Sequence, residues 1–351
     1  MKVLMIGNNP KVKGGITTVI SQLLEHNWKQ EDIDMRFLPT YIDKGPALKI
    51  MYFVGAYFRI IFELVVNKPD VMHIHMSYKG SFTRKYMIHK LCRMFKVRDV
   101  IHLHGSEFKM WYDNTPKKQV KIRRLLREAT AFVVLGEEWN RRIKEIEPKT
   151  NTIIVNNTVS IPEKRTKWND KQYNILFLGV LIARKGVSDL LDAINMLKQD
   201  GKLGSAIFNI AGSGEEETAL KEKSSKLGLD SYVNFLGWTD GNKKRKLLIE
   251  NQLMVLPSYN EGLPMAVLEA MSYGLPIIST NVGDIPVAVK NGVNGYIADP
   301  GDIIALKDNL QKMLAMNEKE WQQFSDNSRK ITEENFNDKD YYKRIAEAYR
   351  E

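Results

Sequence analysis

The segment Met254–Ala270 (MVLPSYNEGLPMAVLEA) combines a short apolar strand, a loop with glycine and proline, and the start of a helix. Met254–Leu256 forms the strand, and Pro264 suits the first position of the helix. Strands that alternate with helices in this way are typical of a parallel sheet covered on both faces. The same alternation continues in both directions along the chain, which predicts an α/β fold.

Apolar runs of strand length occur in both halves of the chain. In the first half the predicted strands are Val3–Ile6, Val71–His75, Val100–Leu103 and Phe132–Leu135, and the helices include Thr17–Glu25, Phe82–Phe95 and Gln119–Glu128. In the second half the predicted strands are Asn174–Leu178, Ile207–Ala211, Val233–Leu236, Met254–Leu256 and Ile277–Ser279. The helices there are Val187–Leu197, Glu216–Leu227, Lys243–Glu250, Pro264–Tyr273 and Ile303–Met316, and residues 319–351 add two more. The pattern therefore starts twice.

The length of 351 residues and a hydrophobic share of 43% fit two globular domains. The polar segment Ser160–Lys171, with Pro162, suits a linker between them. We predict an N-terminal domain over residues 1–160 and a C-terminal domain over residues 161–336. We expect each domain to be a doubly wound, Rossmann-like parallel sheet with helices on both faces. The cleft between the two domains is then the expected active site.

The charge and the cysteine content narrow the class of protein further. The net charge is +10, yet residues 1–165 hold 29 Lys and Arg against 16 Asp and Glu, so this half carries +13 and the rest −3. Such asymmetry indicates an anionic partner, either a nucleic acid, a membrane surface or a phosphorylated substrate. Met1–Gly7 is too short for a signal peptide, no apolar stretch is long enough to span a bilayer, and the single Cys92 fits a reducing cytosol as a packed helix thiol.

Glu261 and Glu269 are the most informative candidate residues. Glu261 lies in the loop beside the start of the predicted helix, and Glu269 lies about one and a half turns into it. A carboxylate among apolar neighbours needs a partner, and a ribose diol would satisfy both oxygens of Glu269. The alternative is a salt bridge within the helix, but no Lys or Arg lies three or four residues from Glu269.

Three further turns between a strand and a helix suit the binding of an anion. They carry Gly14 and Gly15, the adjacent cations Arg184 and Lys185, and the pair Gly212 and Gly214. Glycine admits close approach of a ligand to the backbone, and a helix N-terminus favours negative charge. Arg can hold phosphate oxygens bidentately, whereas Lys acts as a point charge. Plain βα turns and a solvated basic turn are the alternatives.

His104 ends a predicted strand at a small Gly105 turn. A histidine at that place can hydrogen-bond a sugar hydroxyl or move a proton, although a structural histidine is the alternative. His73 and His75 lie on another strand, and no Cys or carboxylate cluster completes a metal site with them. We therefore expect neither a metal nor a cofactor.

Taken together, these features resemble the retaining glycosyltransferases of the GT-B fold, specifically the large family 4, over essentially the whole chain. The most specific element is the spacing of Glu261 and Glu269 within Glu261–Met271, and Gly274–Thr280 and Asn291–Tyr296 are also similar to that family. The resemblance implies a two-domain enzyme that holds a nucleotide-sugar donor mainly with its second domain. A metal-independent hexosyltransferase with a UDP-sugar donor is the expected activity.

The resemblance also implies a role for each candidate residue. Glu269 would hold the ribose, Arg184 and Lys185 the leaving diphosphate with help from the Gly15 amide, and His104 would lie over the donor sugar. Glu261 would hold the donor sugar together with the backbone around Gly262, Leu263, Pro264 and Met265. The loop with Gly212 and Gly214 and the backbone around Trp238 would border the base, and a C-terminal helix at about 337–351 would return to the first domain. The chain departs from the family pattern at Val180, at Gly283–Val287 and at Asn157–Thr158.

The excess of positive charge lies in a basic amphipathic segment, Lys117–Arg127, and before the aromatic segment Ile50–Phe58. Basic residues beside apolar ones suit a peripheral membrane face. We expect the first domain to lie on the inner face of the cell membrane and to receive a lipid-linked or glycan acceptor, as in polysaccharide synthesis. A solvated helix is the alternative for this segment. A sugar-nucleotide epimerase and a nucleic-acid-binding protein are the alternative functions, and no nucleic-acid-binding module is recognisable.

Overall fold

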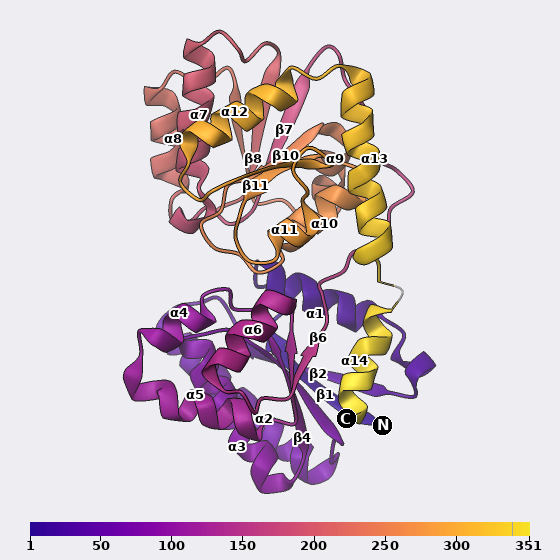
Figure 1. The fold of residues 1–351 in the computed structure, drawn as a ribbon. Coiled ribbons are helices and arrows are strands. Elements are labelled where there is room, and N and C mark those ends of the chain that lie inside the picture. Colours follow the sequence, from indigo (N-terminus) through magenta and orange to yellow (C-terminus); the bar gives the residue numbers. More distant parts are fainter. Residues whose placement is uncertain (339) are drawn as a thin grey trace. The chain divides into compact units, whose positions relative to one another are not determined.

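The computed structural model describes residues 1–338 and 340–351, which form two compact units. The first unit comprises Met1–Asn157 and the C-terminal helix α14 (Tyr341–Arg350), and the second comprises Thr158–Asp338. Each unit contains one six-stranded parallel sheet with helices on both faces (Figure 1). The two-domain, doubly wound α/β fold predicted from the sequence is confirmed.

The sheet of the first unit has the order β2-β1-β3-β4-β5-β6. Its strands are β1 (Lys2–Asn8), β2 (Asp34–Tyr41), β3 (Val71–Met76), β4 (Arg98–Leu103), β5 (Ala131–Val134) and β6 (Thr152–Ile154). Its helices are α1 (Gly15–Glu25), α2 (Pro46–Val66), α3 (Gly80–Phe95), α4 (Phe108–Asp113), α5 (Pro116–Glu128) and α6 (Glu137–Ile146). The strand order reverses between β1 and β3, so the switch point of this sheet lies there.

The central strands of the first unit are buried along most of their length because helices cover both of their faces. All residues of β3 and β5 are buried. Cys92 of α3 is fully buried beside Met72, with 3.5 Å between the two sulfur atoms. Burial and the nearby Asp99 charge raise the pKa of the Cys92 thiol well above its ordinary value. This cysteine is therefore a packed thiol.

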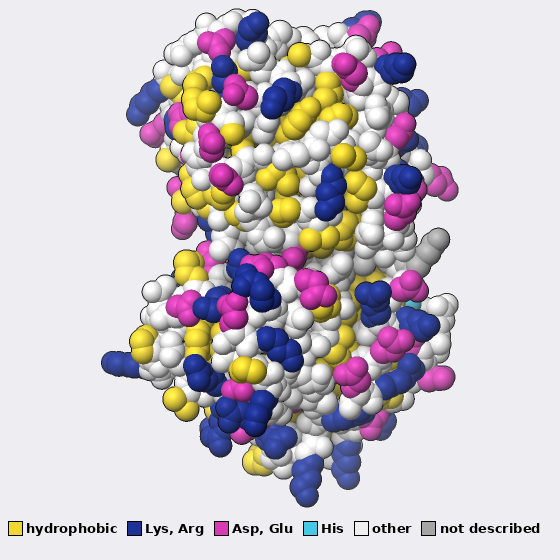
Figure 2. Space-filling model, viewed as in Figure 1, with side chains coloured by type: hydrophobic (Ala, Val, Ile, Leu, Met, Phe, Trp, Pro, Cys, Tyr) yellow, Lys and Arg dark blue, Asp and Glu magenta, His cyan; other side chains and the backbone are white. Residues whose placement is uncertain are grey.

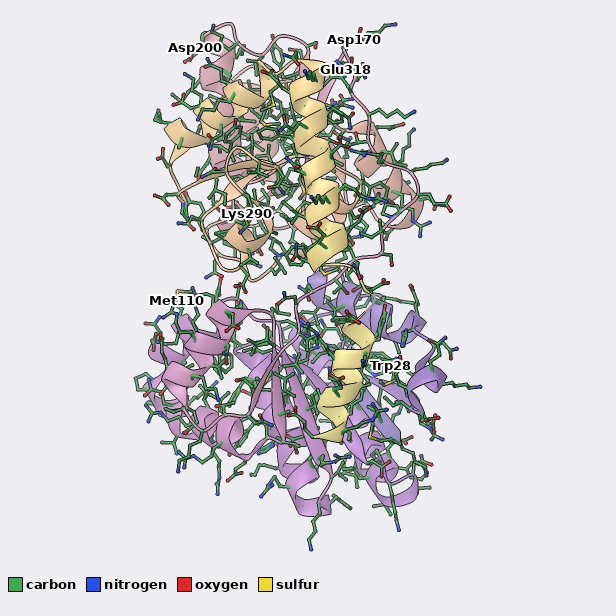
Figure 3. All side chains as sticks on the ribbon, turned by 45° about the vertical axis from the view of Figure 1, so that its right-hand side comes forward. Trp28, Met110, Asp170, Asp200, Lys290 and Glu318 are labelled. Carbon is green, nitrogen blue, oxygen red and sulfur yellow. The ribbon has the colours of Figure 1, made fainter. Side chains whose placement is uncertain are left out.

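Helix α14 completes the first unit. Its Tyr342 ring stacks on His26, with 3.7 Å between the ring centroids, and Trp28 lies beside the same helix (Figure 3). The Tyr349 hydroxyl forms a hydrogen bond of 2.6 Å with His73 Nδ1 in the core. Helix α14 thus packs on the same sheet that contains the N-terminal strand β1.

The sheet of the second unit has the order β12-β11-β10-β7-β8-β9. Its strands are β7 (Tyr173–Leu178), β8 (Ala206–Ala211), β9 (Val233–Gly237), β10 (Leu253–Leu256), β11 (Ile277–Thr280) and β12 (Gly295–Ala298). Its helices are α7 (Val187–Gln199), α8 (Glu217–Lys226), α9 (Gly241–Glu250), α10 (Met265–Ser272), α11 (Ile285–Ala288), α12 (Ile303–Leu314) and α13 (Glu318–Asn335). Here the order reverses between β7 and β10, which makes their carboxyl ends the expected ligand site.

The structure adds three strands that the sequence did not predict, namely β2, β6 and β12. Helix α10 begins at Met265, one residue after the expected Pro264. Among the described residues, no helix has both the length and the apolar character that crossing a bilayer requires.

Candidate active site

The loops after β7 and β10 pack tightly against each other at the switch point of the second sheet. Arg184 and Lys185 lie in a 3-10 turn (Ala183–Lys185) that ends at Gly186, whose φ is 66°. A Cβ at Gly186 would come within 2.0 Å of the Pro257 carbonyl oxygen, and the Tyr259 amide donates to the Arg184 carbonyl at 2.7 Å. Only glycine fits this left-handed turn, so the sequence fixes where the two cations lie.

Glu261 lies at the centre of an ion cluster formed by these loops. Lys185 Nζ donates to Glu261 Oε1, and Arg184 Nη1 lies 3.8 Å from Glu261 Oε2. The side chains of Lys185 and Glu261 are only 12% and 8% exposed, whereas that of Arg184 is 33% exposed. The structure therefore brings the adjacent Arg184 and Lys185 together with Glu261, which follows Lys185 by 76 positions in the sequence.

One hydroxyl holds the Glu261 carboxylate, and the loop of Gly283 and Asp284 packs against the backbone of Glu261 and Gly262. Ser258 Oγ donates to Glu261 Oε1 at 2.8 Å, and the sequence analysis did not single out this serine. The Asp284 amide donates to the Gly262 carbonyl at 3.0 Å, and Gly283, with φ of 56°, lies so close that a Cβ would be 2.3 Å from the Glu261 carbonyl. Because the cluster carries two cations and one carboxylate, it retains one positive charge with which to hold an anion.

Gly262, Leu263, Pro264 and Met265 connect Glu261 to α10. Leu263 and Met265 are buried, and the Pro264 carbonyl accepts hydrogen bonds from Val267 and Leu268 in the first turn. The amide end of α10 thus begins within four residues of the Glu261 carboxylate.

Glu269 of α10 forms an ion pair with Lys244 of α9, and the distance from Nζ to Oε1 is 2.7 Å. Their side chains are 16% and 25% exposed. This cation lies on a different helix, so the spacing of residues within α10 does not predict it, and the only signal in the sequence is the basic run Lys243–Lys246 of the preceding helix. The proposed binding of a ribose therefore involves a carboxylate that already has a partner on another helix.

Gly212 and Gly214 are needed for packing within the second unit, independently of any ligand. A Cβ at Gly212 would lie 1.8 Å from the Gly179 carbonyl oxygen, and one at Gly214 would lie 2.1 Å from the Leu181 carbonyl oxygen. These glycines let the loop after β8 pack on the loop after β7. Trp238 follows β9, which β8 separates from β7, so it lies at the end of the second strand away from the cluster.

Gly14 and Gly15 of the first unit differ from that pair. They follow β1 and begin α1, with Gly14 at a φ of 130°. No atom of the described chain, other than those of the adjoining residues and the helix backbone, lies within 4 Å of a Cβ built at either position. The turn is therefore open to a group that approaches the backbone at the amide end of α1.

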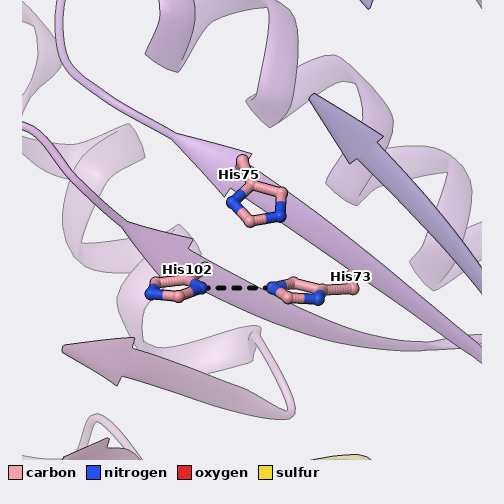
Figure 4. Close-up of side chains that lie close together, drawn as sticks. All are labelled: His73, His75 and His102. Atoms are coloured by element: carbon pink, nitrogen blue, oxygen red, sulfur yellow. Dashed lines mark hydrogen bonds between the residues drawn. The ribbon is translucent and has the colours of Figure 1, made fainter. Parts of the chain in front are cut away.

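His104 directly follows β4 and belongs to a set of four histidines, the others being His73 and His75 on β3 and His102 on β4. His75 pairs in register with His102, so His73, His75, His102 and His104 gather on neighbouring strands (Figure 4 shows the first three). His75 Nδ1 lies 2.8 Å from His104 Nε2, and His73 Nε2 lies 3.4 Å from His102 Nδ1. Burial lowers the pKa of His73 and of His104 to about 3, so both rings are neutral near pH 7.

The tautomer of His104 follows from the surroundings of His75. Burial also lowers the pKa of His75 well below its ordinary value, and its Nε2 is buried without a hydrogen-bond partner in the part of the chain that the structure describes. A neutral imidazole carries one N–H, and a buried N–H without an acceptor is costly. The proton of His75 is therefore assigned to Nδ1, which donates to His104 Nε2. His104 then carries its own proton on Nδ1 and can donate it to a hydroxyl.

Three of these four histidines lie close enough together to be a candidate metal site. His73, His75 and His102 offer nitrogen atoms that all lie within 4.8 Å of one another. Their rings are nearly parallel, with interplanar angles of 11° to 29°, and His75 stacks on the other two. Imidazole lone pairs lie in the ring plane, so those of stacked rings do not converge on one point. The geometry thus favours hydrogen-bonded pairs over a chelated ion.

Comparisons with known proteins agree with this architecture. The family described as glycosyl transferases group 1 matches residues 160–331, which are nearly the whole second unit. Sucrose-phosphate synthase from Thermosynechococcus elongatus has a similar structure, with a TM-score of 0.83 at 16% identity over 99% of this chain and 98% of its own. The chain is a glycosyltransferase of the GT-B fold, and its second unit belongs to the glycosyl transferases group 1.

Two further proteins are similar over most of their length. The Anabaena protein HepE, solved in complex with UDP-glucose, has a TM-score of 0.77 at 17% identity over 99% of this chain and 98% of its own. The UDP-Gal:alpha-D-GlcNAc-diphosphoundecaprenol alpha-1,3-galactosyltransferase of Escherichia coli is 27% identical over 289 residues, which are 76% of this chain and 71% of that protein. The predicted GT-B fold is thereby confirmed, and the match to the glycosyl transferases group 1 is consistent with the predicted family.

Proposed function

We propose that the protein is a retaining hexosyltransferase that transfers a sugar from a nucleotide-sugar donor, most simply a UDP-sugar, to a lipid-linked glycan acceptor in the synthesis of a cell-surface polysaccharide. The observation that carries this proposal is the cluster of Arg184, Lys185 and Glu261 at the switch point of the second sheet. The nucleotide of the HepE complex and the acceptor in the name of the Escherichia coli relative support the donor and acceptor classes.

In this proposal the cluster stabilises charge in the transition state. Glycosyl transfer places negative charge on the departing diphosphate and positive charge on the sugar ring. Lys185 is held by Glu261 before the reaction and needs little reorganisation, while the more exposed Arg184 can contact the phosphate oxygens. Preorganised cations of this kind typically contribute 10²–10³ in rate. They supply the charge that a divalent metal would otherwise supply, so we propose a metal-independent reaction.

The remaining candidate residues bind the substrates. We assign Glu269 to the ribose hydroxyls, Glu261 and the start of α10 to the donor sugar, and Gly15 to the diphosphate. His104, protonated on Nδ1, donates to a sugar hydroxyl rather than acting as a base. Trp238 and the loop of Gly212 and Gly214 border the base.

The acceptor side of the proposal uses the first unit. Helix α5 buries Ile122, Leu125 and Leu126 and exposes most of its cations, and Lys and Arg gather on this unit in Figure 2. Each cation near an anionic leaflet adds about 1 kcal/mol of attraction. We therefore propose that the protein acts on the inner face of the cell membrane as a peripheral protein.

Thermal shift with a panel of UDP-, GDP- and ADP-sugars tests the donor class. A donor at a hundred times its Kd should stabilise the protein by about 2.7 kcal/mol, whereas the other nucleotides should not. The selected donor is then incubated with a lipid-diphosphate glycan acceptor, with and without EDTA, and NMR determines the anomeric configuration of the product. Transfer with retention in EDTA supports the proposal. Donor turnover without an acceptor indicates an epimerase, and inversion or a metal requirement refutes the mechanism.

A further inference from the structure

Helix α2 of the first unit has two apolar faces. One face packs into the core through Phe53, Ala56, Ile60 and Leu64, which are at most 8% exposed. The opposite face consists of five apolar side chains at a spacing of three or four residues, each between 47% and 69% exposed. They are Met51, Val54, Phe58, Phe62 and Val65. A spacing of this kind places all five on one stripe, about 20 Å long at 1.5 Å per residue.

This stripe is unusual for a helix on a protein surface. A single exposed apolar residue needs no explanation, but a contiguous row of them marks an interaction site. Leu48, Ile50 and Val66 of the same helix are also more than half exposed. Among the described residues, eight of the eighteen large hydrophobic side chains that are exposed belong to this one helix.

Helix α3, which contacts α2, also exposes apolar side chains. It exposes Met87 and Met94, at 40% and 65%, and they are two turns apart. We define the α2 face as the five residues of the stripe together with these two methionines.

Cations surround the α2 face. Lys44 precedes the helix, Arg59 is exposed in its middle, and Lys68 follows its end. Lys49 lies in the first turn, where its ammonium pairs with Asp43 at 3.1 Å. Helix α3 adds exposed cations at Lys90 and Arg93. Long basic side chains at the ends of an apolar stripe can reach lipid phosphates while their stems stay on apolar surface.

The charge of the first half decides between a bilayer and a second copy of the chain. Residues 1–165 carry a net charge of +13, so two copies that met through this face would bring surfaces of like charge together. An anionic leaflet complements both the apolar stripe and its cations. Because the other side of α2 is fixed in the core, the helix can lie in the membrane surface but cannot cross it.

We propose that the α2 face inserts into the interfacial region of an anionic bilayer and orients the first unit on the membrane. The proposal rests on the proposed function in so far as a lipid-linked acceptor explains why an enzyme would need this surface. It identifies α2 as the inserted element, with α5 contributing only attraction at a distance.

Flotation of the full-length protein with vesicles tests the proposal. Vesicles of phosphatidylcholine are compared with vesicles that also contain 30% phosphatidylglycerol, for the wild type and for the double variant Phe58→Ser/Phe62→Ser. The expected result is flotation of the wild type with anionic vesicles only, and a loss of more than tenfold in the double variant. The matched control is Val293→Ser/Ile304→Ser, which removes two exposed apolar side chains of the second unit and should float like the wild type.

Folding and oligomeric state are measured on the same samples. Both variants should keep the melting temperature of the wild type, since each removes only exposed apolar surface. Equal flotation of the wild type and the Phe58→Ser/Phe62→Ser variant would overturn the proposal. A concentration-dependent dimer that the same substitutions abolish, with no flotation, would also overturn it and assign the α2 face to a second copy.

The outcome is separable from that of the proposed function. Transfer is assayed in parallel with a detergent-solubilised acceptor, where no bilayer is needed. A protein that floats but transfers nothing retains the α2 proposal and loses the enzymatic one. A protein that transfers in detergent but does not float loses only the α2 proposal.

Discussion

Lys185 should contribute to both stability and catalysis, and a double-mutant cycle can separate the two. The substitution Lys185→Met removes the ammonium from Glu261 while keeping an aliphatic side chain of similar length. Removing one partner of a buried ion pair typically costs about 3–5 kcal/mol because the other charge stays buried. Here the Ser258 hydroxyl at 2.8 Å and the Arg184 guanidinium at 3.8 Å still contact the carboxylate. The expected loss is therefore smaller, about 2–3 kcal/mol.

The second arm of the cycle removes the charge that is left behind. In Lys185→Met/Glu261→Gln the carboxylate becomes a neutral amide, so most of the lost free energy of unfolding should return. For a domain the size of the second unit, 2–3 kcal/mol corresponds to a melting shift of about 4–12 °C. Differential scanning calorimetry of the four proteins measures the shift, and the interaction energy of the pair should be about 1–3 kcal/mol.

Activity should follow a different pattern in the same four proteins. Glu261→Gln can lower activity by itself, because Glu261 is assigned to the donor sugar. If Lys185 stabilises the leaving diphosphate, Lys185→Met therefore lowers kcat by about 10²–10³ in both the wild-type and the Glu261→Gln background. Recovery of kcat along with stability would show that Lys185 serves only to neutralise Glu261. A single variant as stable as the wild type would refute the electrostatic reasoning itself.

Three further predictions concern the other groups of the two units. Glu269→Gln should raise the Kd for the donor at least tenfold in calorimetric titration. Lys244→Met should change the Kd less, because the Glu269 carboxylate remains and can still accept hydrogen bonds from the ribose hydroxyls. The folded pKa of His73 is about 3 and the unfolded value is about 6.5, so the unfolded state binds more protons between these values. Urea unfolding should accordingly show full stability above pH 6.5 and a loss of about 2 kcal/mol from His73 at pH 5, and a flat profile would contradict its burial as a neutral ring. His75→Asn keeps an N–H for His104 and should retain kcat and the Kd for the donor, whereas His75→Asp offers only an acceptor, moves the His104 proton to Nε2, and should raise the Kd for the donor as well as lower kcat.

The strands that the sequence predicts and those it misses differ in their place in the sheet. Strands such as β3 and β5 are buried on both faces, and their sequences are mainly apolar, with His73 and His75 as the exceptions in β3. The three missed strands, β2, β6 and β12, all lie at the edge of a sheet. An edge strand has one hydrogen-bonded neighbour and is partly exposed, so its sequence need not be apolar, as the alternating burial and the Pro39 of β2 show. The apolar pattern that predicts a strand reflects its burial, so the prediction is least reliable for strands that are partly exposed.

The candidate site divides in a similar way. Arg184, Lys185 and Glu261 could be predicted because each lies in the loop after a strand, and the carboxyl ends of parallel strands meet at one edge of the sheet. The ion pair of Glu269 with Lys244 and the contact of His75 with His104 could not, because they depend on how one helix or strand aligns with another. The spacing of residues within one helix or strand does not predict how that element aligns with its neighbours.

The glycines show most clearly what a local pattern leaves undecided. Gly14 and Gly15 follow β1, and Gly212 and Gly214 follow β8, so the sequence gives both pairs the same interpretation as ligand-facing turns. A Cβ would meet no other atom at the first pair, but would strike a backbone carbonyl at the second. Alanine at Gly212 should therefore destabilise the second unit whether or not a donor is present. Alanine at Gly15, where the space is open, should leave folding intact and lower only the activity, which makes this pair of substitutions a test of ligand contact that is independent of the ion cluster.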